Sequence, residues 1–162
     1  MSKSVSITPA RSAEELRITA MLFAAYADSL GIDLGFQEFA TELQSLPGKY
    51  TPPTGEILLA RTTDGMLVGC VALWPLDTNG CSEMKRLYIV PEGRGLGIGK
   101  KLVSAILEFA KSAGYREIKL DTLPHMVEAV SLYKRAGFVE TKPYYATPLD
   151  GTKLLARDLD EA

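Results

Sequence analysis

The chain has 162 residues, 46% of them hydrophobic, and a formal net charge of −2. It is long enough to bury one core, and it lacks the basic excess of a protein that neutralises many nucleic-acid phosphates. We therefore expect a single domain over residues 1–162 without a nucleic-acid partner. The first ten residues lack an apolar leader core, and no stretch approaches about 20 apolar residues, so we expect a cytoplasmic protein without membrane contact.

The cysteines give no sign of a disulfide framework or a metal site. Cys70 and Cys81 lie in apolar or strand-like surroundings without paired spacing, which favours buried reduced thiols over a disulfide or a catalytic cysteine. His125 is the single histidine. No metal is therefore expected.

The N-terminal third is predicted to hold one strand and two helices. Residues 5–9 have the pattern of a strand, and Ser12 with Glu15 forms a capping box that opens a helix to about residue 29. Apolar spacing over residues 36–43 predicts a second short helix, which ends before Pro47 and precedes a loop at residues 49–55.

Three strands should follow as an antiparallel meander. Apolar runs cover residues 56–61 and 67–74, and the Asp64-Gly65 pair between them favours a tight hairpin turn. A second turn at Asn79-Gly80 leads into a strand at residues 82–90.

Helices and strands alternate in the C-terminal half. The expected elements are a helix at 97–113 closed by Gly114, a strand at 117–121, a helix at 124–136 stopped by Gly137, and strands at 138–141 and 153–159. This order predicts an α/β (α+β) fold with a mixed, mostly antiparallel sheet of about seven strands and about four helices on its two faces.

A glycine-rich turn connects the strand at 82–90 to the next helix, with the sequence Arg94-Gly95-Leu96-Gly97-Ile98-Gly99-Lys100. Three alternating glycines let several backbone N–H groups surround one anion, and the helix N-terminus adds about half a positive charge. The spacing is neither that of a P-loop nor that of the dinucleotide fingerprint. The turn therefore indicates phosphate binding, with a ligand-free tight turn as the alternative.

Two segments resemble the GNAT acetyltransferases. Arg94-x-x-Gly97-x-Gly99 after Leu87-Tyr88-Ile89-Val90-Pro91 is similar to the acetyl-CoA signature of that family, and residues 129–138 are similar to its helix and strand near the cofactor's sulfur. The resemblance covers about residues 83–139. It implies acetyl-CoA as co-substrate, no metal, a homodimer, and a GNAT-like sheet in which a parallel strand pair splays at the cofactor site.

The resemblance also assigns cofactor contacts. The family's turn binds the pyrophosphate, which implies roles for Arg94, Gly95, Leu96, Gly97, Ile98, Gly99 and Lys100, while backbone groups of Leu87, Tyr88 and Ile89 would bind the pantetheine arm. Met126 departs from the pattern, since many members have a cofactor-binding asparagine there. Losing one such hydrogen bond costs about 1 kcal/mol, which is small beside the whole cofactor interface.

Acetyl transfer to an amine needs a proton acceptor for the amine and a proton donor for the departing thiolate. Tyr133 matches the family tyrosine that protonates coenzyme A, although spacing alone would make it a core residue. Glu83, eleven residues before Arg94, resembles strand-borne glutamates that act as the general base, and a solvated charge at a strand start is the alternative. Tyr145 is a candidate acceptor contact, and His125 is read as a loop residue.

These features predict an N-acetyltransferase that moves an acetyl group from acetyl-CoA to a primary amine of a small molecule or peptide, by direct attack in a ternary complex. One alternative is a non-catalytic coenzyme A or acyl-CoA binding or sensing module. Another, a toxin that acetylates aminoacyl-tRNA, suits the length but not the weakly negative charge.

Overall fold

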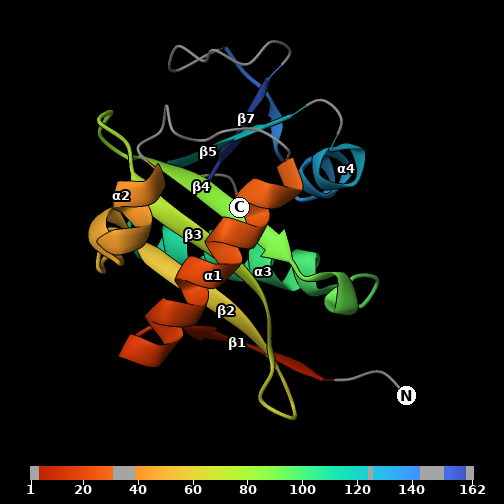
Figure 1. Cartoon of the computed structure of the whole chain (residues 1–162). Coiled ribbons are helices and arrows are strands. Elements are labelled where there is room, and N and C mark those ends of the chain that lie inside the picture. The colour runs from red at the N-terminus through yellow and green to blue at the C-terminus, as the bar shows by residue number, and fades with distance from the viewer. Residues whose placement is uncertain (1–3, 31–38, 124–125, 143–151, 160–162) are drawn as a thin grey trace.

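Seven strands form one sheet in the order β1-β2-β3-β4-β5-β7-β6 in the computed structural model of the chain (Figure 1). Every neighbouring pair is antiparallel except β4 and β5. The strands are β1 (Val5–Pro9), β2 (Glu56–Thr62), β3 (Leu67–Pro75), β4 (Cys81–Ile89), β5 (Glu117–Thr122), β6 (Val139–Glu140) and β7 (Lys153–Asp158).

The structure describes residues 4–30, 39–123, 126–142 and 152–159. Outside these ranges lie residues 36–38 of the second predicted helix, His125 and Tyr145. Within them no helix is both long and apolar enough to span a bilayer.

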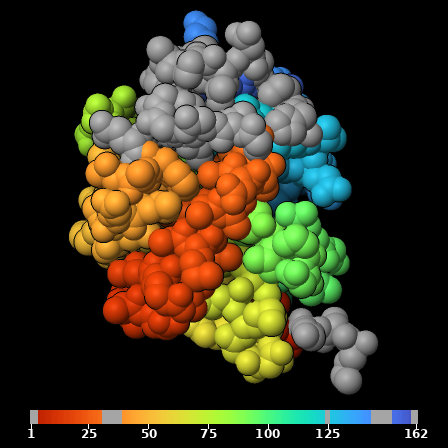
Figure 2. All heavy atoms as spheres, in the orientation of Figure 1, coloured from red at the N-terminus to blue at the C-terminus, as the bar shows by residue number. Residues whose placement is uncertain are grey.

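Helices cover both faces of the sheet. The α-helices of the described residues are α1 (Ala13–Leu30), α2 (Phe39–Gln44), α3 (Ile98–Ser112) and α4 (Val127–Arg135), with 3₁₀ turns η2 (Gly48–Tyr50) and η3 (Pro91–Gly93). One face packs against α1 and α2, and the other packs against α3 and α4. Figure 2 shows the first face, where α1 runs between α2 and the green turn that precedes α3.

A hydrophobic core lies on each face of the sheet, and successive residues of one strand point alternately into the two cores. In β2, Leu58 and Ala60 join the core under α3, whereas Ile57 and Leu59 join the core under α1. Full burial of one such leucine contributes about 1.5–3 kcal/mol. The central strands therefore have continuous apolar runs, because both of their faces are buried.

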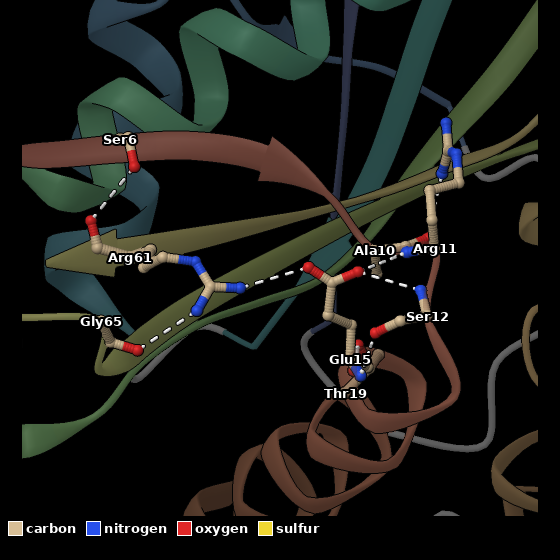
Figure 3. Close-up of polar contacts among 8 residues, drawn as sticks. All are labelled: Ser6, Ala10, Arg11, Ser12, Glu15, Thr19, Arg61 and Gly65. Carbon is tan, nitrogen blue, oxygen red and sulfur yellow. Dashed lines mark hydrogen bonds and ion pairs between the residues drawn. The ribbon is translucent and has the colours of Figure 1, made fainter.

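A capping box fixes the start of α1, as the sequence predicts (Figure 3). The Glu15 N–H donates to Ser12 Oγ at 3.0 Å, and the Ser12 N–H donates to Glu15 Oε1 at 2.9 Å. The other Glu15 oxygen accepts from Arg61 of β2 at 3.2 Å. A cap of this kind stabilises a helix by about 1 kcal/mol, and here it also ties α1 to the sheet.

The predicted elements are confirmed in type and order, with two differences in detail. The helical spacing of apolar residues predicts that α3 buries Ile98, Leu102, Ala105, Ile106 and Phe109. In the structure Ala105 and Phe109 are only half-buried, whereas Val103, Leu107 and Ala110 are buried. This helix crosses β2, β3 and β4, and a broad sheet covers a wider helix face than a narrow stripe. The helix α4 begins at Val127, later than predicted.

Candidate functional site

The parallel pair β4 and β5 separates soon after it begins. The two strands pair only at Cys81 with Glu117, Ser82 with Ile118 and Glu83 with Lys119, although β4 continues to Ile89 and β5 to Thr122. Beyond Glu83, no strand among the described residues pairs with the β4 edge that faces β5. This confirms the predicted splay. Leu87, Tyr88 and Ile89 all lie, half-buried, in this open part of β4.

A β-bulge bends β4 where the split opens. Between the pairs Cys70–Tyr88 and Ala72–Lys85, one residue of β3, Val71, opposes two residues of β4, Arg86 and Leu87. Within the bulge Arg86 has a φ of +61°, and an L-residue in that region costs roughly 1–2 kcal/mol. The bulge twists the strand locally and re-aims the residues that follow it.

The turn requires glycine at its three glycine positions for two different structural reasons. Gly95 and Gly97 have φ values of +82° and +74°, and a Cβ atom on either would meet nothing within 4 Å. Their backbone conformation therefore requires glycine, and the space beside them is open. Gly99 lies inside α3, where a Cβ would approach Leu132 Cδ2 of α4 to 3.1 Å, so it allows the close approach of the two helices.

The turn suits an anionic group by its backbone and its charges. Gly97 is the N-cap of the fifteen-residue α3, whose first N–H groups have no partner within the helix. Arg94 and Lys100 are exposed beside it, while Ile98 is 1% exposed and offers only its backbone. The Arg94 side chain folds back over β4, where its Nε donates to the Ile89 carbonyl at 3.2 Å.

Tyr133 of α4 is buried in the core beneath α3 and lies near Asp121 of β5. Its ring is 6% exposed and meets Phe138 edge to face, with 6.0 Å between ring centroids. Burial raises the pKa of Tyr133, and nearby Tyr26 and Asp121 raise it further. Tyr26 comes from α1 on the opposite face of the sheet, and burial raises its pKa to about 12. The gap between β4 and β5 thus brings together side chains from both helical layers.

Glu83 lies in a buried polar cluster and is only 4% exposed. The Trp74 indole donates to its Oε1 at 2.8 Å, and Lys85 Nζ lies 3.7 Å from the same oxygen. Lys85 also lies 4.7 Å from the centre of the Trp74 ring, whose plane stacks on Tyr50. The structure therefore excludes the alternative reading of Glu83 as a solvated surface charge.

Asp121 is a candidate site residue that the sequence did not indicate. It is half-buried on β5, two residues beyond Lys119, the last residue paired with β4. Burial raises its pKa; Lys85 and Arg86 oppose this rise, and Glu83 adds to it. In the sequence, only its position on the strand expected beside β4 could have indicated a functional role for Asp121. The alternation of polar Asp121 with apolar Leu120 is found in any half-exposed strand and does not single it out.

The structure thus brings Glu83, Asp121 and Tyr133 to one split, beside the open part of β4 that leads directly into the glycine turn. Met126 begins α4 without a side-chain cap. Within the described ranges, no three His, Cys, Asp or Glu side chains are grouped so that they could hold a metal ion. Cys70 and Cys81 are free and buried, as predicted.

Known proteins are similar to this chain in sequence and in fold. The model of the acetyltransferase (GNAT) family matches residues 21–138. An uncharacterized N-acetyltransferase of Schizosaccharomyces pombe is 42% identical over 146 residues, which cover 90% of each chain. One from Dictyostelium discoideum is 30% identical over 79% of this chain and 87% of its own.

A solved structure supports the fold. The GNAT-family acetyltransferase of Staphylococcus aureus superimposes with a TM-score of 0.78 over 96% of this chain and 99% of its own, at 24% identity. The family match covers the split, the glycine turn and α4 together. This chain therefore belongs to the GNAT family of acetyltransferases and is an acyltransferase enzyme.

Proposed function

We propose that this enzyme transfers an acetyl group from acetyl-CoA to a primary amine of a small molecule or peptide, in a ternary complex within one domain. The observation that carries the proposal is the strand split, which opens an unpaired β4 edge leading directly into a glycine turn at a helix N-terminus. A long ligand with an amide-bearing arm and a phosphate-bearing end suits this combination.

The turn would hold the pyrophosphate. Gly95 and Gly97 leave free space beside their backbone, and the exposed side chains of Arg94, Lys100 and Lys101 add positive charge. Anions are favoured at such a helix end by both its N–H groups and its dipole. The backbone of Leu87, Tyr88 and Ile89 would bind the pantetheine arm along the split.

The reaction needs no covalent enzyme intermediate. The amine nitrogen attacks the thioester carbonyl carbon, the C–N bond forms, and the C–S bond breaks. Tyr133 would donate its phenolic proton to the departing thiolate, because a phenol is protonated at neutral pH and its ordinary pKa of about 10 is close to that of a thiol, about 8.5.

Two carboxylates are candidates for the base that takes the proton from the amine. Glu83 is the one that the sequence indicates, and its contacts with Trp74 and Lys85 hold it in a fixed orientation. Asp121 is the second, because burial moves its pKa toward that of an amine. Their separate roles are tested by the two substitutions described in the Discussion.

We propose further that the enzyme works in the cytoplasm and forms a homodimer, of which the family resemblance implies the homodimer. Light scattering of the purified protein should give twice the 17.6 kDa mass of the chain. A mass of one chain at micromolar concentration would refute the dimer.

The decisive experiment is calorimetric titration with acetyl-CoA of the wild type, Gly97→Trp and Gly114→Trp. Both glycines have positive φ, at +74° and +89°, and both face open space, so the two variants carry similar backbone strain. They lie at opposite ends of α3, about 22 Å apart for a fifteen-residue helix. Only Gly97→Trp should obstruct the phosphate turn.

Micromolar binding that is lost in Gly97→Trp and kept in Gly114→Trp would establish the cofactor site. Thiol release with a panel of amines then tests transfer. Binding without release for any amine would favour the non-catalytic sensing module, and no binding by the wild type would refute the use of acetyl-CoA.

A further inference from the structure

Arg86 occupies a strained position at the start of the cofactor-facing part of β4. Among the described residues it is the only non-glycine residue with a positive φ, at +61°. Such a conformation persists only where the surrounding structure determines it strongly. The contacts of Arg86 therefore show what holds the bulge in place.

Two residues of α2 hold the Arg86 side chain. Its Nε and Nη2 atoms each lie 3.0 Å from a different carboxylate oxygen of Glu42, and its Cζ lies 5.1 Å from the centre of the Phe39 ring. The Arg86 and Glu42 side chains are only 4% and 10% exposed. A two-pronged pair shielded from water fixes geometry more strongly than an exposed ion pair does.

The backbone of Arg86 is held from the opposite side. The thiol of Cys70, on β3, donates to the Arg86 carbonyl oxygen with 3.3 Å between sulfur and oxygen. The strained residue is thus fixed at its carbonyl by β3 and at its guanidinium by α2. Tyr88 pairs with Cys70 in the ladder, so the held segment leads directly into the predicted cofactor strand.

We propose that Arg86 is a positioning residue: through Glu42 it locks α2 onto the bulge of β4, and thereby fixes the backbone of Leu87–Ile89 in the shape that receives acetyl-CoA. On the β5 side no described strand supports this segment, so its conformation must be held from β3 and α2. The identity of the ligand rests on the proposed function, whereas the lock itself does not.

The test compares Glu42→Gln and Arg86→Gly with Glu56→Gln. Glu56 is the control, because its buried carboxylate also forms a two-pronged pair, with Arg11 at 2.7 and 2.8 Å, although the Arg11 side chain is 50% exposed. That pair lies at the start of β2, away from the bulge. Arg86→Gly removes the ion pair with Glu42 without adding backbone strain, because glycine adopts a φ of +61° readily but has no side chain to reach Glu42.

Amide hydrogen exchange tests the lock without any ligand. Exchange in the peptide spanning residues 86–90 should accelerate about tenfold in Glu42→Gln and Arg86→Gly, and should stay at the wild-type rate in Glu56→Gln. Wild-type exchange at this peptide in Arg86→Gly would overturn the proposal, and this variant decides the matter if Glu42→Gln fails to fold.

Calorimetry then tests the consequence for the ligand. The apparent Kd for acetyl-CoA should rise about five- to tenfold in both lock variants, because only a fraction of molecules would hold the competent strand shape. Faster exchange with an unchanged Kd would overturn the positioning role. A wild type that binds no acetyl-CoA would refute the proposed function, while the exchange result would still decide the lock.

Discussion

The indole nitrogen of Trp74 lies 2.8 Å from Glu83 Oε1, and the two residues are direct partners across the antiparallel pair of β3 and β4. The ammonium group of Lys85 lies 3.7 Å from the same oxygen. A buried carboxylate with a hydrogen-bond donor and a cation can stay in a single orientation. Glu83 is thus presented at the strand split by the sheet itself, which makes it testable by an isosteric change.

Replacement of Glu83 by glutamine should lower kcat/KM for the amine about 10²- to 10⁴-fold, the range expected for loss of a general base. The glutamine keeps the shape and accepts the Trp74 hydrogen bond, so acetyl-CoA affinity should stay within about twofold. Steady-state kinetics across the pH range measures the first quantity, and calorimetry the second.

Glu117→Gln is the matched control, since Glu117 lies on β5 where the strands are still paired. Its kcat/KM should equal that of the wild type. If Glu83→Gln retains full kcat/KM at every pH, Glu83 has no role as a base and Asp121 becomes the candidate.

Replacement of Asp121 by asparagine should raise stability at neutral pH. Burial raises the pKa of this carboxyl in the folded state above its ordinary value of 3.8. A group with a raised folded pKa contributes stability below its unfolded pKa and loses that contribution as the pH rises through the folded pKa. The charged carboxylate is therefore unfavourable at about pH 7, and asparagine avoids this cost.

Urea denaturation of both proteins at about pH 7 and about pH 3.5 checks the sign. The variant should unfold at higher urea at neutral pH, and the difference should shrink in acid, where both side chains are neutral. If Asp121 is the base, the same variant should also lose activity, whereas full activity would leave Glu83 as the candidate. A variant that is less stable than the wild type at about pH 7 would contradict the burial argument.

Replacement of Tyr133 by phenylalanine should lower kcat about 10²-fold while leaving acetyl-CoA affinity nearly unchanged, because only proton donation to the thiolate is removed. Single-turnover kinetics should place the loss in the chemical step. Tyr115→Phe is the control: this tyrosine donates to the Thr54 carbonyl at 2.6 Å, away from the split. Equal kcat for wild type and Tyr133→Phe would reduce Tyr133 to a core residue.

Local sequence determined the order of the elements, since each depends on neighbouring residues. The capping box of Ser12 and Glu15, the Asp64-Gly65 hairpin and the glycine turn before α3 all form as their spacing predicts. Alternating and helical apolar patterns report burial without reference to the rest of the chain. The two segments at residues 87–99 and 129–138 were sufficient to indicate the GNAT family.

Tertiary structure alone decided which side chains meet at the split. Glu42 and Arg86 pair across 44 positions of sequence, and a glutamate in a six-residue helix carries no sign of this role. Asp121 resembles any polar residue of an alternating strand, and only the fold brings it near enough to Lys85, Glu83 and Arg86 of β4 for their charges to affect its pKa. Tyr26 of α1 raises the pKa of Tyr133 of α4, although the two helices cover opposite faces of the sheet. Contacts of this kind depend on strand register and helix packing, which no local pattern encodes.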